Sequence, residues 1–164
     1  MAANPLTDGA HLAPVETQTV EVAASSPAAD RSVLPDYFVR QAGAEFAGLH
    51  LLVDLWDAHG LDDIALVERA MREAVEACEA TLLNLHLHHF GETQDACGEA
   101  QGVSGVAVLA ESHISIHTWP ERGYAAVDIF MCGACDPHAA VPVFERHFKS
   151  GSVEVNEAKR GLVR

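Results

Sequence analysis

Two runs of alternating residues, 113–119 and 124–132, constrain the fold more than any other stretch of the sequence. In the first run, HISIHTW, apolar residues alternate with His and Ser, which is the period-two pattern of a β-strand. The second run, YAAVDIFMC, follows the segment PERG, whose proline and glycine are typical turn residues. The segment therefore predicts a β-hairpin within an antiparallel sheet.

The second strand of this hairpin has no properly polar face. The residues of one parity are Ala125, Val127, Ile129 and Met131, and those of the other are Tyr124, Ala126, Asp128, Phe130 and Cys132. Helices cover one face of a sheet in a two-layer fold. We therefore expect the other face to pack against a second protomer in a homodimer.

The rest of the chain supplies further strands and helices around this hairpin. Strands are expected at 46–56, 81–90, 102–110 and 152–158. Apolar residues recur at helical spacing over 62–80, which predicts a helix. A second helix is expected from Asp136 to about Lys149, with Pro142 kinking its first turns. This order of elements predicts an α/β (α+β) two-layer sandwich with a mainly antiparallel sheet and helices on one face.

The first 42 residues differ in composition from the rest. They are rich in Ala, Pro, Ser and Asp, which predicts a disordered N-terminal extension with a short ordered piece at DYFVRQ. Residues 43–164 are then expected to form one domain. The start lacks the basic and apolar regions of a signal peptide, and no apolar run approaches a membrane span, so we expect a cytoplasmic protein.

The chain is strongly acidic. Asp and Glu number 24 against 10 Lys and Arg, for a formal net charge of −14. This balance argues against nucleic acid and anionic membranes as partners, and weakly favours a cationic small molecule. The cysteines Cys78, Cys97, Cys132 and Cys135 are expected to be thiols in a cytoplasmic protein.

Histidines suggest a first candidate site. They are His86, His88, His89, His113 and His117. Imidazoles two residues apart on a strand point to one side and can share a metal ion. No carboxylate stands at a recognisable ligand spacing, so we expect no metal site, and a half-polar sheet face is the simpler interpretation.

Two further patterns remain open from the residues alone. Cys132 and Cys135 form a C-x-x-C motif, which is typical of a redox pair or of half a zinc site, although a second matching pair is missing. Ser112, His117 and Cys132 combine a hydroxyl, a base and a thiol, which suggests a hydrolase with Ser112 as the nucleophile. The glycines of a nucleophile elbow are absent around Ser112, so separate polar residues on strands are the alternative.

The string GVSGVAVLAESHISIHTWPERGYAAVDIFMCG, residues 102–133, resembles the core of the bacterial S-adenosylmethionine decarboxylases. The resemblance continues upstream through GLHLLVDLW and HLHHF, and it covers most of residues 46–160. Loop 91–101 is longer than the short turn usual in this family. The resemblance implies a pyruvoyl-dependent enzyme that decarboxylates S-adenosylmethionine and so makes the aminopropyl donor for spermidine, a polyamine.

The resemblance also implies that the chain cuts itself between Glu111 and Ser112. The Ser112 hydroxyl would attack the preceding carbonyl, and Ser104 matches the family residue that stabilises the resulting oxyanion. His117 matches the base that removes the α-proton of residue 112. Residue 112 would then become the pyruvoyl cofactor.

Further roles are implied for residues around this bond. The pyruvoyl carbonyl would form a Schiff base with the substrate amine, and Cys132 matches the acid that protonates the substrate carbon after carboxylate loss. Phe90 matches an aromatic residue that stacks on adenine, and Glu121 matches a carboxylate that binds ribose hydroxyls. Asp54 stands where relatives carry an acidic residue near the site.

The spacing of Ser112 and His117 raises a geometric difficulty. Residues separated by an odd number face opposite sides of a regular strand. We therefore expect Ser112 to lie in the turn before the strand, in strained backbone that also favours the acyl shift. Cleavage there would give chains 1–111 and 112–164.

Two alternatives to this function stay open. A related pyruvoyl-dependent enzyme would decarboxylate arginine or ornithine, since the lengthened loop 91–101 follows Phe90 directly. An inactive regulatory homologue is the other alternative, and the retained serines, histidine and cysteine of the implied site argue against it.

Overall fold

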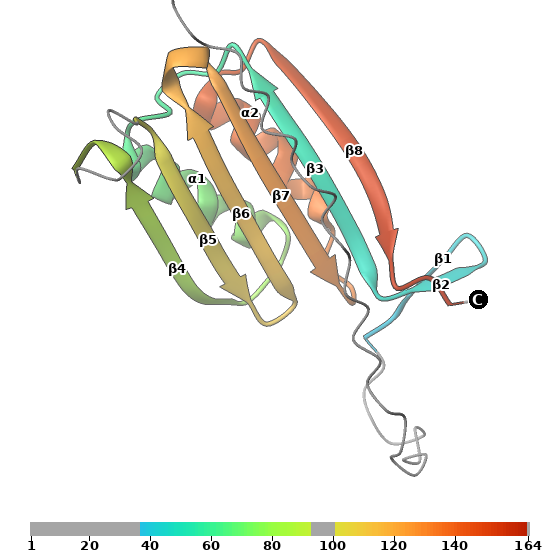
Figure 1. Cartoon of the computed structure of the whole chain (residues 1–164). Helices are drawn as coiled ribbons and strands as arrows, with labels where there is room; N and C mark the ends of the chain where they lie inside the picture. The colour runs from blue at the N-terminus through green and yellow to red at the C-terminus, as the bar shows by residue number, and fades with distance from the viewer. Residues whose placement is uncertain (1–36, 93–100, 164) are drawn as a thin grey trace, which may run out of the picture. The chain divides into compact units, whose positions relative to one another are not determined.

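An antiparallel sheet covered by helices on one face forms the body of the computed structural model (Figure 1). Within the described residues, 37–92 and 101–163, six strands form this sheet in the order β4-β5-β6-β7-β3-β8, and every neighbouring pair is antiparallel. The strands are β3 (Gly48–Trp56), β4 (Leu82–His89), β5 (Val103–Leu109), β6 (Ser112–Trp119), β7 (Tyr124–Cys132) and β8 (Ser152–Arg160). The helices α1 (Ile64–Ala77) and α2 (Val141–Phe148) lie behind the sheet in this view. The expected two-layer sandwich is confirmed.

A small hairpin precedes the sheet. Its strands β1 (Val39–Gln41) and β2 (Ala44–Phe46) pair antiparallel, so the domain boundary expected at residue 42 falls inside this hairpin. The ordered piece expected at DYFVRQ corresponds to β1. The disorder expected for the earlier part of the extension concerns residues 1–36, which lie outside the described residues.

Both helices begin at residues that suit a helix start. Asp63 caps α1 by accepting a hydrogen bond from the Leu66 N–H at 3.0 Å. The second helix differs from the expected single one, because a 3₁₀ turn, η3 (Pro137–Ala140), precedes α2. Pro142 lies in the first turn of α2, where its missing N–H removes no intrahelical bond. The expected kink is therefore a junction between two short helices.

The core lies between the sheet and the two helices. Alternate residues of the central strands are fully buried against it, and they include Leu51, Leu55, Ile114, Ile116 and Ile129. From the helices, Met71 of α1 and Phe144 and Phe148 of α2 complete this core. The large apolar side chains stabilise the sandwich because each removes its surface from water.

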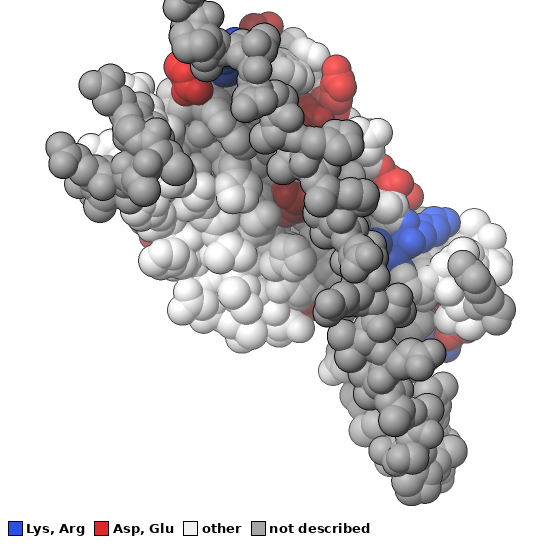
Figure 2. Space-filling model, viewed as in Figure 1, with Lys and Arg blue, Asp and Glu red and all other residues white. Residues whose placement is uncertain are grey.

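The opposite face of the sheet carries no helix and exposes large apolar side chains. They are Leu52, Trp56, Val108 and Trp119, with exposed fractions of 45%, 43%, 44% and 41%. Figure 2 shows that the visible surface over β4–β6 on this face is mostly free of charged residues. This is the face that we expect to pack in a homodimer, and the dimer stays a prediction. Within the described ranges, no helix has the length and apolar character needed to span a membrane.

Candidate active site

Ser112 is the first residue of β6, directly after the tight turn that joins β5 to β6. Leu109 and Ser112 are paired across this turn, which leaves Ala110 and Glu111 at its tip. The backbone of Ser112 has φ of 146°, a value that L-residues other than glycine rarely adopt. The expected strain is therefore present, although Ser112 begins the strand rather than lying within the turn.

The carbonyl of Glu111 already accepts a hydrogen bond from a neighbouring strand. The Cys132 N–H donates to this oxygen at 3.0 Å, because the pairing of β6 with β7 brings the end of β7 beside the turn. A backbone N–H at this oxygen is the kind of donor that stabilises an oxyanion when a carbonyl is attacked. Sequence reasoning missed this donor, since a main-chain N–H has no signature among residue types. We call Glu111, Ser112 and Cys132 the cleavage group.

A second set of predicted residues gathers around a cavity of about 660 Å³. The residues that line it are Phe90, Gln101, Ser104, His117, Thr118, Trp119 and Glu121. Ser104 and His117 are paired across β5 and β6, and Ser104 Oγ lies 2.8 Å from His117 Nδ1. We call Phe90, Ser104, His117 and Glu121 the pocket group.

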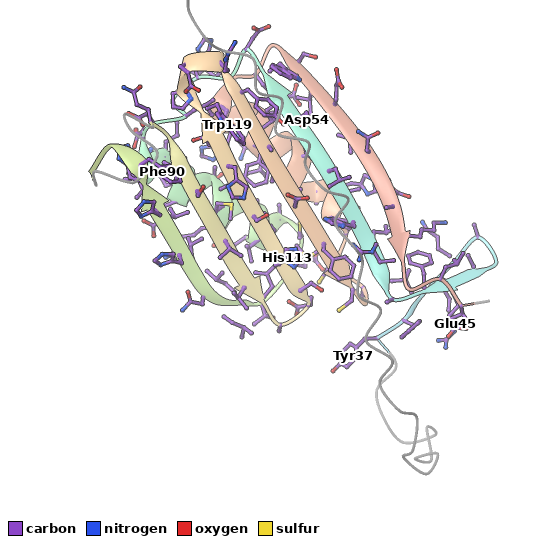
Figure 3. The ribbon with its side chains drawn as sticks, viewed as in Figure 1. Tyr37, Glu45, Asp54, Phe90, His113 and Trp119 are labelled. Atoms are coloured by element: carbon purple, nitrogen blue, oxygen red, sulfur yellow. The ribbon has the colours of Figure 1, made fainter. Side chains whose placement is uncertain are left out.

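The two groups lie toward opposite ends of β6. Five residues separate Ser112 from His117 along this strand, and at the usual rise per residue their Cα atoms are about 17 Å apart. In Figure 3, His113, next to Ser112, and Trp119, beyond His117, lie toward opposite ends of the strand. Proton transfer needs donor and acceptor within about 3 Å, or one bridging water. Within one chain, His117 therefore cannot serve Ser112.

The ends of the loop beside the pocket are tied to the segment before α1. Gly102 N–H donates to Asp62 Oδ1 at 2.9 Å, and His89 Nε2 lies 3.0 Å from the same oxygen. Phe90 N–H in turn donates to the Gly102 carbonyl at 3.0 Å. Asp62 thus fixes both chain ends from which Phe90 and Gln101 reach the cavity. The intervening residues 93–100 lie outside the described residues.

Asp54 is joined to the edge of the cavity through aromatic rings. Tyr124 donates its hydroxyl to Asp54 Oδ1 at 2.5 Å, and this bond raises the pKa of Tyr124 to about 12. The Tyr124 ring stacks between Trp56 and Trp119, with centroids 4.4 Å and 5.2 Å away. Trp119 was not singled out from the sequence, although it lies two residues beyond His117 on the same face.

The histidine and C-x-x-C patterns are two other candidate sites noted in the sequence. In the described part of the chain, no group of three or more His, Cys, Asp and Glu residues is arranged to hold a metal ion. Burial, together with the nearby Glu111, Cys132 and Glu79, raises the pKa of Cys135. A raised pKa disfavours the thiolate that redox exchange and metal binding require. Cys97 lies outside the described residues.

Comparison with known proteins bears on the whole of this region. A family model described as S-adenosylmethionine decarboxylase matches residues 49–161, which include both groups. This chain belongs to the S-adenosylmethionine decarboxylase family. The resemblance noted in residues 102–133 is thereby confirmed.

Individual members of the S-adenosylmethionine decarboxylase family support this assignment. The chain is 44% identical over 117 residues to the S-adenosylmethionine decarboxylase proenzyme of Thermomicrobium roseum, covering 71% of this chain and 95% of the relative. It is 47% identical over 119 residues to the proenzyme of Methanococcus vannielii, covering 71% and 91%. The crystal structure of the adenosylmethionine decarboxylase from Aquifex aeolicus superposes with a TM-score of 0.62 at 31% identity, covering 73% and 94%.

Proposed function

We propose that this protein is a self-cleaving S-adenosylmethionine decarboxylase whose active sites each combine the cleavage group of one protomer with the pocket group of another. This proposal rests mainly on the distance of about 17 Å between the Cα atoms of Ser112 and His117 on one strand. Membership of the family supports the reaction, and the strained Ser112 backbone supports the site of cutting.

Self-cleavage would begin at the Glu111 carbonyl. Ser112 Oγ attacks the carbonyl carbon, and the oxyanion is stabilised by the Cys132 N–H that already binds this oxygen. The C–N bond then breaks, which leaves an ester between Glu111 and the Ser112 side chain and a free amine on residue 112. A base removes the α-proton of residue 112, and the bond between its β-carbon and the ester oxygen breaks, so that Glu111 leaves with a new C-terminal carboxylate. Hydrolysis of the resulting dehydroalanine at position 112 releases ammonia and leaves the pyruvoyl group.

The contact between His117 and Ser104 suits both residues to this chemistry. In the tautomer whose Nδ1–H donates to Ser104 Oγ, Nε2 carries no proton and can act as the base. The Ser104 hydroxyl then keeps its own proton for donation to the oxyanion. Both side chains act on a neighbouring protomer in this proposal, because their own Ser112 is out of reach.

A two-fold dimer would supply both groups at once. Under a two-fold axis, each protomer offers the same surface to the other, so that two identical composite sites form. Pairing of the helix-free faces would also cover the exposed Leu52, Trp56, Val108 and Trp119. Pairing of the helix-free faces would thus form both the homodimer and its composite sites.

The cavity of the pocket group suits a nucleoside. Its volume of about 660 Å³ lies in the usual range for small-molecule sites. Phe90 offers an aromatic face for adenine and Glu121 offers a carboxylate for ribose hydroxyls, and both line this cavity. These features favour S-adenosylmethionine over arginine or ornithine, which have neither group.

The residues around position 112 fit the formation and use of a pyruvoyl group. This group would supply a carbonyl that accepts the electrons released when the substrate loses its carboxylate. Cys132 is half-buried and lies beside residue 112 at the end of β7. In this proposal, its thiol donates a proton to the substrate carbon.

Two measurements on purified protein test this function. Intact mass under denaturing conditions is expected to show chains 1–111 and 112–164, whereas Ser112→Ala stays whole because alanine has no hydroxyl. Release of labelled carbon dioxide is then compared for S-adenosylmethionine, arginine and ornithine. If carbon dioxide is released from arginine or ornithine but not from S-adenosylmethionine, the proposed substrate is wrong. An uncut chain would refute self-cleavage.

A further inference from the structure

We propose that Thr81 is a positioning residue for self-cleavage, because it holds the side chain of Glu111 and so fixes the bond that is cut. Thr81 N–H donates to Glu111 Oε2 at 2.8 Å, and Thr81 Oγ1 donates to Glu111 Oε1 at 3.1 Å. The Ala110 N–H donates back to the Thr81 carbonyl at 3.0 Å. This inference rests on the proposed cleavage site and deepens it.

The sheet brings Thr81 to the turn from a distant part of the sequence. Thr81 directly precedes β4, and the pairing of Leu82 with Leu109 places it beside the tip of the β5–β6 turn. Its amide and hydroxyl each bind a different oxygen of the Glu111 carboxylate. Hydrogen bonds to a charged acceptor are stronger than neutral ones, so this contact restrains the turn well.

Glu111 is therefore held from two sides. Its carboxylate is bound by Thr81 on the β4 side, and its carbonyl oxygen is bound by the Cys132 N–H on the β7 side. Ser112 follows at once with φ of 146°. Such a conformation persists only where the surroundings over-determine it, and these two anchors supply that restraint.

Restraint at this point matters for the rate of cutting. Ser112 Oγ must approach its own preceding carbonyl carbon, and small departures from a productive geometry cost large factors in rate. Release of the Glu111 side chain would let the turn rotate about residues 110 and 111. The attack would then be slower, although the attacking hydroxyl and the oxyanion donor are both present.

The same placement keeps Thr81 away from the pocket group of its own protomer. Thr81 lies at the start of β4, whereas Phe90 follows the far end of that strand. Loss of the Thr81 hydroxyl should therefore leave the pocket group unchanged. Once cut, a Thr81 variant is expected to bind S-adenosylmethionine with the wild-type KM.

The test follows the appearance of chain 112–164 over time after cell-free synthesis, by intact mass. Thr81→Val keeps the backbone N–H and the branched shape but lacks the hydroxyl, and it is expected to cut on the order of tenfold more slowly. Thr81→Ser keeps the hydroxyl and is expected to cut at nearly the wild-type rate. Cutting of Thr81→Val at the wild-type rate would overturn the proposal, as would equal slowing of both variants.

A double variant tests whether Thr81 acts through Glu111. If it does, Thr81→Val combined with Glu111→Gln is expected to slow cutting less than the product of the two single effects. Independent, multiplying effects would overturn the proposal. Failure of the wild-type chain to cut at Glu111–Ser112 would refute the proposed function instead, so the two failures are distinguishable.

Discussion

Co-expression of Ser112→Ala with His117→Ala chains is expected to restore self-cleavage and activity that neither variant has alone. The Cα atoms of Ser112 and His117 are about 17 Å apart on one strand, far beyond the roughly 3 Å of a hydrogen bond. In a mixed dimer, the His117→Ala chain supplies Ser112 and the Ser112→Ala chain supplies His117. One of the two composite sites is then complete, and the other lacks both groups.

The expected recovery follows from the symmetry of the dimer. With equal amounts and random pairing, about half of the dimers are mixed, so about a quarter of all sites are complete. Intact mass should show about half of the His117→Ala chains cut, since each mixed dimer cuts one of them. Carbon dioxide release per site should reach about a quarter of the wild-type value under the same pairing.

A matched pair of variants controls for chance recovery. Ser112 and Cys132 belong to the same cleavage group, beside the Glu111 carbonyl. Ser112→Ala combined with Cys132→Ala should therefore gain no activity in mixed dimers. Absence of cut chains in mixed Ser112→Ala and His117→Ala dimers, or recovery in the control pair, would refute the composite site.

The other predictions concern the proposed proton donor Cys132, the Tyr124 hydroxyl and the helix-free face of the sheet. Cys132→Ala is expected to cut itself but to lose about a hundredfold or more in turnover, and to accumulate an inactive 112–164 chain detectable by mass, while Cys135→Ala behaves as wild type. The free energy of unfolding of wild type should exceed that of Tyr124→Phe by its full amount below pH 10, and this difference should disappear as the pH rises to about 12. The reason is that the hydrogen bond to Asp54 raises the pKa of Tyr124 in the folded state. Urea unfolding of both proteins across this pH range measures the difference. Leu52→Asp, on the helix-free face, is expected to sediment as a monomer at micromolar concentration and to remain uncut, and a cut monomer would contradict the composite site.

Local patterns in the sequence were sufficient for the elements of the fold. The strand expected at 124–132 has those bounds in the structure, because period-two alternation and the flanking turn residues are properties of neighbouring residues. The helix expected at 62–80 is shorter, from Ile64 to Ala77, since it begins after the Asp63 cap and ends before Cys78. Where a kink was expected at Pro142, the structure has the start of α2, because proline is tolerated in the first turn of a helix.

The candidate site was also indicated by the sequence, because Ser112, His117 and Cys132 stand in the stretch that resembles the family, and their roles stay predictions. Their odd spacing indicated that Ser112 and His117 do not share a face of the strand. Only the tertiary structure decided which groups come together. Thr81 and the Cys132 N–H bind Glu111, and Phe90 and Ser104 line one cavity. These contacts depend on the register of strands that are distant in sequence, and register is set by the packing of the whole sheet.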